Sequence, residues 1–255
     1  MRRRAAQQDQ FARIAPYYDA LMASVPYALW AEYVRNLAAL SGRPIVPGCE
    51  LLDLATGTGS VALEFARAGC IVTGIDLSAP MIAQARQKAR NQGLNARFVC
   101  QDLANFDLPA EFDHAVCLYD SLNYILEPGR LKQAFANTRR ALKDDGLFVF
   151  DVNTMHALEA ELFTQESRPD AEVTYRWKSR YDSKTRVSTI RMSFTVVATG
   201  ERIQIVHRQR GYSDAELRSS LFDAGFSEVN AYDGYRVTPP GPESDRVFYV
   251  ARPTV

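Results

Sequence analysis

The stretch LLDLATGTGSVALEF, Leu51 to Phe65, decides the fold of this chain. It begins with an uninterrupted apolar run, typical of a strand covered on both faces, and continues through a glycine turn into a helical pattern. A strand that turns tightly into a helix needs glycine where φ is positive or where a ligand approaches the backbone. The helix behind such a turn presents free N–H groups and the positive end of its dipole. The stretch therefore predicts a ligand-binding strand–loop–helix unit.

Two ligands fit this loop by its local pattern. Read from Gly57, the letters GTGSVA satisfy the dinucleotide fingerprint G-x-G-x-x-G/A. Asp76, at the end of the next predicted strand, suits both hydroxyls of a ribose in either ligand. Asp53 separates the two, because an acid beside the loop repels a pyrophosphate but suits an ammonium group. Asp102 ends the run FVCQD, where a carboxylate suits an adenine amino group. Together these acids favour S-adenosylmethionine (SAM) over NAD.

The rest of the chain predicts an α/β protein. From residue 50 to 152, strand-like runs alternate with helical patterns of ten or more residues, which implies crossover connections and a parallel sheet. Three later segments alternate apolar and polar positions, which indicates an antiparallel three-stranded meander: 171–181, 186–198 and 202–212. A helix with Ser213 and Glu216 at capping-box spacing follows. Two final strands, joined by a link too short for a crossover helix, favour an antiparallel pair.

Composition narrows the class of protein. The length of 255 residues suits one α/β domain that carries an insertion. The formal net charge is +0, so no global field draws the chain to nucleic acid, although a local basic patch stays open. The sequence has no run of about 18 apolar residues, which argues against a membrane span. No apolar segment follows the basic MRRRAAQQ, so we do not expect a signal peptide. The four cysteines are isolated, so we expect structural thiols and no metal site. We expect a cytoplasmic monomer or homodimer without a nucleic-acid or membrane partner.

Five motifs carry a family resemblance. LLDLATGTG, VTGIDLSAPMI, FVCQDL, FDHAVCLYDSLNYI and LKDDGLFVFDV resemble, in order, the motifs of class I SAM-dependent methyltransferases. The meander, the fourth motif DSLNY and the pattern H-x-Q-R-x-Y are similar to a bacterial small-molecule subgroup, and more distantly to amino-sugar N,N-dimethyltransferases. The resemblance implies a Rossmann-like, doubly wound seven-stranded sheet of order 3-2-1-4-5-7-6 with the last strand antiparallel. It also implies methyl transfer from SAM to a small molecule, with S-adenosylhomocysteine as product.

The resemblance also assigns roles at the cofactor site. Asp53 would lie under the amino group of SAM, Asp76 would bind the ribose, and Asp102 the adenine. The glycine loop departs from the family at Ala55, where many members carry glycine. The residues expected to bind SAM are Tyr18, Asp53, Ala55, Gly57, Gly59, Asp76, Leu77, Met81, Asp102, Leu103 and Tyr119, with Leu77, Met81 and Leu103 around the adenine ring.

The acceptor side is less defined by sequence. Methyl transfer from a sulfonium is an in-line displacement that requires no protein nucleophile, so we look for residues that align the acceptor or remove a proton. The catalytic candidates are His207, Tyr18 and Asp120, and the substrate-binding candidates are Asn123, Tyr124 and Arg210. His207 shares an inward strand face with Ile203 and Ile205, whereas Arg210 lies on the other face. A histidine base predicts a loss of turnover below about pH 6.5.

We expect three parts in the chain. Residues 1–46 would form a helical lid, residues 47–153 and 213–255 the SAM-binding domain, and residues 154–212 a substrate cap. Two alternatives remain open at this point. One is an NAD-dependent oxidoreductase, and the other is a SAM-binding sensor without turnover.

Overall fold

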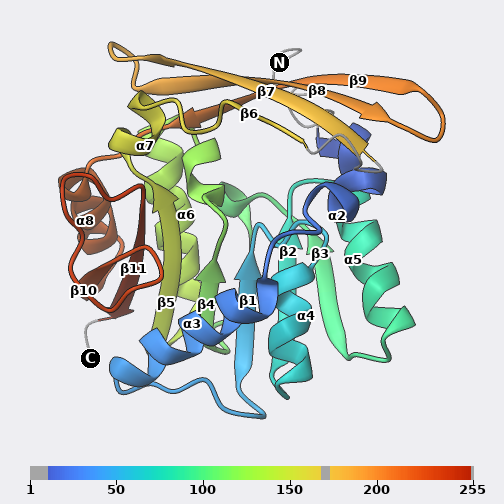
Figure 1. Ribbon diagram of the computed structural model, residues 1–255. Helices are drawn as coiled ribbons and strands as arrows, with labels where there is room; N and C mark the ends of the chain where they lie inside the picture. The colour runs from blue at the N-terminus through green and yellow to red at the C-terminus, as the bar shows by residue number, and fades with distance from the viewer. Residues whose placement is uncertain (1–10, 168–172, 254–255) are drawn as a thin grey trace.

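The computed structural model describes residues 11–167 and 173–253. Residues 1–10 of the expected lid, residues 168–172 of the expected cap and residues 254–255 lie outside the described residues. Figure 1 shows a main sheet with helices on both faces and a second sheet across one end of it. In the described part of the chain, no helix has both the length and the apolar character that a membrane span requires.

The main sheet has the expected order and direction. Its seven strands, in chain order, are β1 Glu50–Leu54, β2 Ile71–Asp76, β3 Ala96–Cys100, β4 Phe112–Cys117, β5 Leu142–Asn153, β10 Phe226–Asp233 and β11 Arg246–Pro253. They lie in the order β3-β2-β1-β4-β5-β11-β10, and β11 runs antiparallel to both of its neighbours. Counted within this sheet, the order is the predicted 3-2-1-4-5-7-6.

Helices cover the two faces of the main sheet, and successive side chains of β1 show why. Leu51 packs into one core with α3, α4 and α5, whereas Leu52 packs into the opposite core with α6 and α8. Both residues are fully buried, as expected for a parallel strand covered on both sides. The helices are α3 Tyr27–Leu40, α4 Ser60–Arg67, α5 Ala79–Asn91, α6 Pro128–Ala141 and α8 Asp214–Asp223.

The meander forms the second sheet, which we call the roof sheet. It contains the three expected strands, β7 Val173–Asp182, β8 Val187–Val196 and β9 Glu201–Arg210, and a two-residue strand, β6 Gln165–Glu166, at the edge beside β7. Its inner face carries Ile190, Met192, Phe194, Ile203 and Ile205, which pack with residues from the N-terminal segment. The predicted alternation therefore separates an apolar inner face from a polar outer face.

Short helical elements lie in the loops of the fold. They are η1 Ala15–Tyr17, α2 Tyr18–Leu21, η2 Leu103–Asn105, η3 Ser121–Tyr124 and α7 Met155–Glu159. The predicted capping box is present at the start of α8, where the Ser213 hydroxyl accepts from the Glu216 backbone N–H at 3.2 Å. This cap fixes where the chain leaves β9 and returns to the main sheet.

Candidate active site

A cavity of about 730 Å³ lies between the main sheet and the roof sheet. Its floor comes from the loops that follow β1, β2 and β4, and its cover comes from the roof sheet and the N-terminal segment. The volume falls within the range of small-molecule sites, and its position outside the carboxyl ends of parallel strands is where open α/β sheets bind ligands. Most of the predicted site residues line this cavity.

The loop after β1 has positive φ values at both glycines, as the sequence predicts, and also at Ala55, where the sequence did not predict one. Ala55 has a φ of 55°, Gly57 of 55° and Gly59 of 77°. The Gly57 N–H donates to Asp76 Oδ2 at 2.9 Å, so the loop is tied to the end of β2. Gly59 does not line the cavity, because its α-carbon faces Phe98 and Ala85, and a Cβ there would lie 3.0 Å from both side chains. The second glycine therefore serves the packing of α4 rather than ligand contact.

Two buried acids stand beside this loop. The Asp53 carboxylate accepts from the Thr56 hydroxyl at 2.6 Å, and burial raises its pKa to about 7. Asp76 accepts from the backbone N–H groups of Gly57 and Ser78, and burial raises its pKa as well. A ligand that brings a positive charge or hydroxyl donors to these carboxylates would offset the cost of their burial. The ammonium and ribose hydroxyls of SAM have this chemistry.

The predicted adenine region lies at the next strand ends. Leu77 is 44% exposed, Leu103 is partly buried and Met81 is buried, and all three line the cavity. Asp102 lines it too, but both of its carboxylate oxygens accept from Arg130 Nη2, at 2.8 and 2.6 Å. The carboxylate therefore keeps an arginine partner at the position expected for adenine.

The loop after β4 holds two consecutive residues in the left-handed region. Tyr119 has a φ of 66° and Asp120 of 51°. In this conformation their successive backbone N–H groups both point at Asp151 on β5 and donate to its carboxylate at 2.6 and 2.9 Å. Such a pair of N–H groups forms an anion-binding nest, here filled by a side chain of the protein. The bonds to Asp151 hold the strained loop in place.

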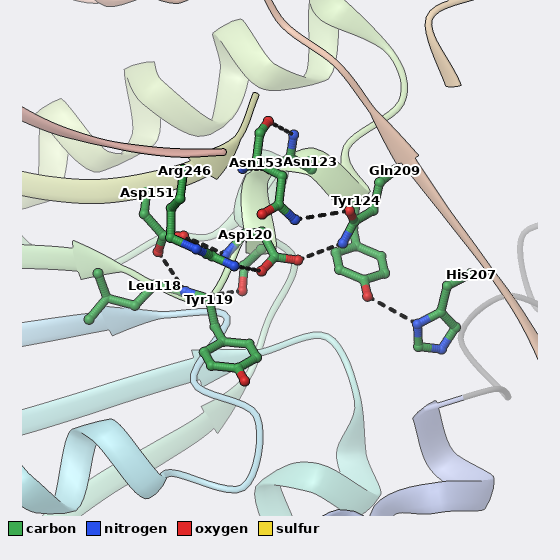
Figure 2. Close-up of polar contacts among 11 residues, drawn as sticks. Leu118, Tyr119, Asp120, Asn123, Tyr124, Asp151, Asn153, His207, Gln209 and Arg246 are labelled. Atoms are coloured by element: carbon green, nitrogen blue, oxygen red, sulfur yellow. Dashed lines mark hydrogen bonds and ion pairs between the residues drawn. The ribbon is translucent and has the colours of Figure 1, made fainter. Parts of the chain in front are cut away.

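Arg246 on β11 completes this cluster. Its guanidinium binds Asp151, and it also donates to Asp120 Oδ1 at 2.8 Å, as Figure 2 shows. Burial alone would lower the pKa of Arg246, but the two carboxylates outweigh it and raise that pKa. Gln209 on β9 donates from Nε2 to the second oxygen of Asp120 at 2.5 Å. Asp120 is therefore clamped between β11 and the roof sheet.

Two predicted substrate-binding residues lie away from the cavity. Asn123 is fully buried, and its side-chain amide donates to the backbone carbonyls of Asn153 and Arg210 at 3.0 and 2.9 Å. The Arg210 guanidinium donates to the Thr185 carbonyl and lies 3.7 Å from Glu216. Neither residue lines the cavity. Both residues have structural roles instead. Asn123 joins the β4 loop to β5 and β9, and Arg210 projects from the outer face of the roof sheet.

His207 and Tyr124 meet at the cavity. The Tyr124 hydroxyl lies 3.0 Å from His207 Nδ1, and the ring of Phe11 lies 4.5 Å from the imidazole, centroid to centroid (Figure 2 shows the hydrogen bond). The imidazole is 4% exposed, and its Nε2 has no hydrogen-bond partner among the described residues. Burial lowers the pKa of His207 to about 4, so the ring is neutral at pH 6.5. The pH at which a histidine base would become protonated therefore lies well below the sequence-based expectation.

The N-terminal segment closes the cavity from the side. Tyr18 lines it, and burial together with the nearby Tyr27 raises the Tyr18 pKa well above its ordinary value. The neighbouring Asp19 accepts from the Thr58 hydroxyl at 2.6 Å and from Lys88 Nζ at 3.0 Å. These bonds tie the segment to the glycine loop and to α5. The expected lid is therefore bonded to the glycine loop that it covers.

Sequence reasoning missed four residues of this site: Asp151, Arg246, Gln209 and Arg130. A local signal existed for two of them. Asp151 is an acid inside the apolar run LFVFDV, and a buried acid needs partners. Gln209 stands two residues after His207 and so shares its inward face. Arg246 gave no local signal, because its partner Asp120 is 126 residues away in the sequence.

Comparison with known proteins supplies the family. A family model described as "Methyltransferase domain" matches residues 51–146. A protein of Geobacillus sp. (strain WCH70), provisionally named a methyltransferase, is 32% identical over 249 residues, which cover 95% of this chain and 99% of that protein. The crystal structure of an S-adenosylmethionine-dependent methyltransferase from Clostridium acetobutylicum ATCC 824 superimposes with a TM-score of 0.83 at 27% identity, over 95% of this chain and 98% of the other. The sugar N-methyltransferase KedS8 from Streptoalloteichus sp. ATCC 53650 shares the fold, with a TM-score of 0.73 at 21% identity over 92% of each chain.

Proposed function

Because this chain belongs to the class I SAM-dependent methyltransferases, we propose that it methylates an uncharged small molecule bound beneath the roof sheet. The observation that carries this proposal is the make-up of the cavity. Acids stand at its floor, where they suit the polar parts of SAM, and its cover is mostly apolar and aromatic, with no charged side chain among the described residues. The two halves have different chemistry, as a site for two different molecules requires.

The floor residues fit SAM in the roles that the family resemblance assigns. Asp53 would face the amino group, which favours its ionised form and offsets the rise in its pKa. Asp76 would accept the ribose hydroxyls with the lone pairs that Gly57 and Ser78 leave free. Leu77, Met81 and Leu103 would pack on the adenine. Asp102 would bind the adenine amino group while Arg130 keeps its charge paired.

The chain's main catalytic contribution in this proposal is alignment. SAM supplies a methyl group on a sulfonium, and the acceptor must be held in line with it. Such alignment is worth about 7–11 kcal/mol. Tyr18 would lie beside the sulfonium and contribute about 0.5–2 kcal/mol of cation–π attraction. His207 would orient the acceptor through Nε2 and take up its proton where the acceptor loses one.

The cover of the cavity supports an uncharged acceptor. The lining residues from the N-terminal segment and the roof sheet include no charged side chain among the described residues. At the floor, Arg130 pairs with Asp102 and Arg246 binds both Asp120 and Asp151, so these charged side chains already have partners. A charged acceptor would therefore lose its hydration without gaining a counter-ion. Two buried nitrogens that have no partner among the described residues, Trp177 Nε1 and His207 Nε2, offer hydrogen bonds to a neutral polar group instead.

The remaining parts of the proposal concern organisation. Residues 1–46 would act as the lid, residues 47–153 and 213–255 as the SAM-binding domain, and residues 154–212 as the substrate cap. The anchoring of Asp19 to Thr58 and Lys88 supports the lid assignment. We propose a cytoplasmic enzyme that works as a monomer or homodimer, and light scattering on the purified chain tests the second point.

Ligand-dependent unfolding tests the cofactor part of this proposal. S-adenosylhomocysteine should stabilise the protein by about 2.7 kcal/mol at a concentration of 100 Kd, because only a ligand of the native state shifts unfolding. NAD should give no shift. A shift with NAD and none with S-adenosylhomocysteine would favour the oxidoreductase alternative. Cofactor binding without methylation of any metabolite in a cell extract would favour the sensor.

A further inference from the structure

The outer face of the roof sheet is strongly basic. Side chains on this face come from alternate positions of β7, β8 and β9, opposite to the apolar residues that cover the cavity. The exposed cations on it are Arg176, Lys178, Arg180, Arg191, Arg202 and Arg208. Among the described residues, the acids on or beside this face are Glu166 on β6, which pairs with Arg176 at 2.6 Å, and Asp182 at the end of β7. In a chain of net charge +0, this is a local excess of positive charge.

The strand register brings these cations together. Lys178 lies directly opposite Arg191, and Arg180 and Arg208 flank Thr189 in the next row. Neighbouring strands lie about 4.8 Å apart, and successive side chains of one face about 7 Å apart along a strand. Like charges directly opposite each other destabilise an antiparallel pair. The fold therefore keeps an unfavourable arrangement, since the five cations other than Arg176 have no acidic partner among the described residues.

We propose that this outer face binds the phosphate backbone of a nucleic acid. The cations are mostly arginines, whose planar guanidinium groups suit phosphate better than an ammonium does. Neutral hydrogen-bonding side chains stand between them, namely Thr189, Ser193, Thr195 and Gln204. This mixture of arginine with hydroxyl and amide groups is typical of contacts to phosphate and sugar. It extends the function of the protein beyond methyl transfer, because the residues of this face alternate with those that line the cavity, and the roof sheet lies across one end of the main sheet (Figure 1).

An anionic membrane is a less suitable partner for this face. Proteins that lie on a bilayer combine basic residues with apolar side chains that enter the interface. Within β7, β8 and β9, the apolar side chains on the outer face are Val187 and Val206, and both are partly buried; Val197, one residue after β8, is 58% exposed. An arginine-rich face whose described side chains include no exposed aromatic ring fits a phosphate chain, which needs charge and hydrogen bonds but no insertion.

The expectation of no nucleic-acid partner rested on the net charge, which averages over the whole molecule. The roof sheet separates its charges by strand alternation, with an apolar inner face and a cationic outer one. Acids elsewhere in the chain balance these cations in the net charge, but they do not lie beside them. The local patch that composition left open is therefore formed by the meander.

Fluorescence anisotropy tests the proposal with the full-length protein and a labelled single-stranded RNA of 20 nucleotides, alongside DNA of the same sequence. If the five unpaired cations contact phosphates, the logarithm of the binding constant should fall linearly with log[salt], with a slope of roughly −3.5. The double variant Lys178→Glu/Arg191→Glu should weaken binding about tenfold or more and reduce the slope to roughly −2. The single variant Lys178→Glu should weaken binding while raising the unfolding midpoint, because it places an acid opposite Arg191.

The matched control is Arg90→Glu/Arg97→Glu, which makes the same change of net charge at exposed positions on α5 and β3. This variant should bind RNA as the parent does. If both double variants lost RNA affinity equally, the loss would come from the change in net charge alone, and the proposal would be overturned. Binding to neither RNA nor DNA, or binding only to vesicles that contain phosphatidylserine, would also overturn it. Binding of S-adenosylhomocysteine by each variant shows that the fold is intact.

Discussion

The Tyr124 hydroxyl lies 3.0 Å from His207 Nδ1, and this contact joins the loop after β4 to the roof sheet. The two residues are 83 positions apart in the sequence: Tyr124 belongs to η3 and His207 to β9. Because Nδ1 is occupied by Tyr124, the remaining nitrogen of His207, Nε2, is the one available to a ligand in the cavity. The roof sheet therefore contributes a polar group to the proposed site as well as a cover.

Replacing His207 should separate turnover from cofactor binding. His207→Ala removes the polar group proposed to orient the acceptor, so kcat/KM should fall roughly 10- to 1,000-fold, while the affinity for S-adenosylhomocysteine changes less than threefold. Tyr124→Phe removes only the hydrogen bond to Nδ1 and should give a smaller loss in the same direction. Steady-state kinetics with calorimetry measure both. Parental kcat/KM in His207→Ala would leave His207 with a packing role alone.

The buried imidazole of His207 should also make stability depend on pH. The unfolded chain takes up a proton near pH 6.5, whereas burial lowers the pKa of His207 in the fold to about 4. The unfolded state therefore binds more protons between these values, and this group costs stability as the pH falls from 6.5 to 4, up to roughly 3 kcal/mol. His207→Gln should lose less stability than the parent between pH 7 and pH 5 in urea unfolding.

The control for this experiment is His156→Gln, whose side chain is 44% exposed at the surface of α7. His156 lies 3.8 Å from Asp245, and because surface ion pairs contribute little, the stability of this variant should stay close to that of the parent at each pH. A parallel pH dependence in the parent and in His207→Gln would mean that the buried imidazole does not contribute.

Asp76 should matter for the cofactor more than for the fold. Asp76→Ala would remove two charge-assisted hydrogen bonds to ribose, each worth about 1.5–3 kcal/mol, and should weaken SAM binding at least about 100-fold. Calorimetry on the folded variant measures this effect. Asp107→Ala, at a side chain that is 99% exposed, is the matched control and should bind as the parent does. Unchanged affinity in Asp76→Ala would remove the ribose assignment.

Ala55 should be a site where glycine stabilises the protein. Its φ of 55° is costly for a residue with a Cβ, and glycine adopts it freely. Glycine also loses more conformational entropy on folding than alanine does, and this cost offsets part of the gain. The net expectation is that Ala55→Gly raises the free energy of unfolding by about 0.5–1 kcal/mol. Ala83→Gly, at an exposed position inside α5, should have the opposite sign and cost about 1 kcal/mol. A loss of stability in Ala55→Gly would show that its methyl group makes contacts that outweigh the strain.

The main sheet could be predicted because its signals are local. Continuous apolar strands, glycine turns and helix caps such as Ser213 each fix one element within a few residues, and the order of motifs fixes the sheet. The cofactor side followed for the same reason, since Asp53 and Asp76 stand at predictable strand ends. Strand alternation also gave the inward face of His207 without any knowledge of its neighbours.

The ion cluster could not be predicted, because its partners are brought together only by the tertiary fold. Arg246 reaches Asp120 and Asp151 from β11, and no spacing in the sequence marks those pairs. Asn123 was misassigned for a related reason. A polar side chain in a motif beside the cavity suggests ligand contact, but this amide satisfies the buried carbonyls of Asn153 and Arg210 instead.

Transfer of a labelled methyl group tests the central claim most directly. The protein is incubated with methyl-labelled SAM and a cell extract, and the products are separated into small molecules, protein and nucleic acid. We predict that the label enters an uncharged small molecule, that S-adenosylhomocysteine forms in equal amount, and that Asp76→Ala loses both. Label found only in the protein or nucleic-acid fraction, or no consumption of SAM, would contradict methyl transfer to a small molecule beneath the roof sheet.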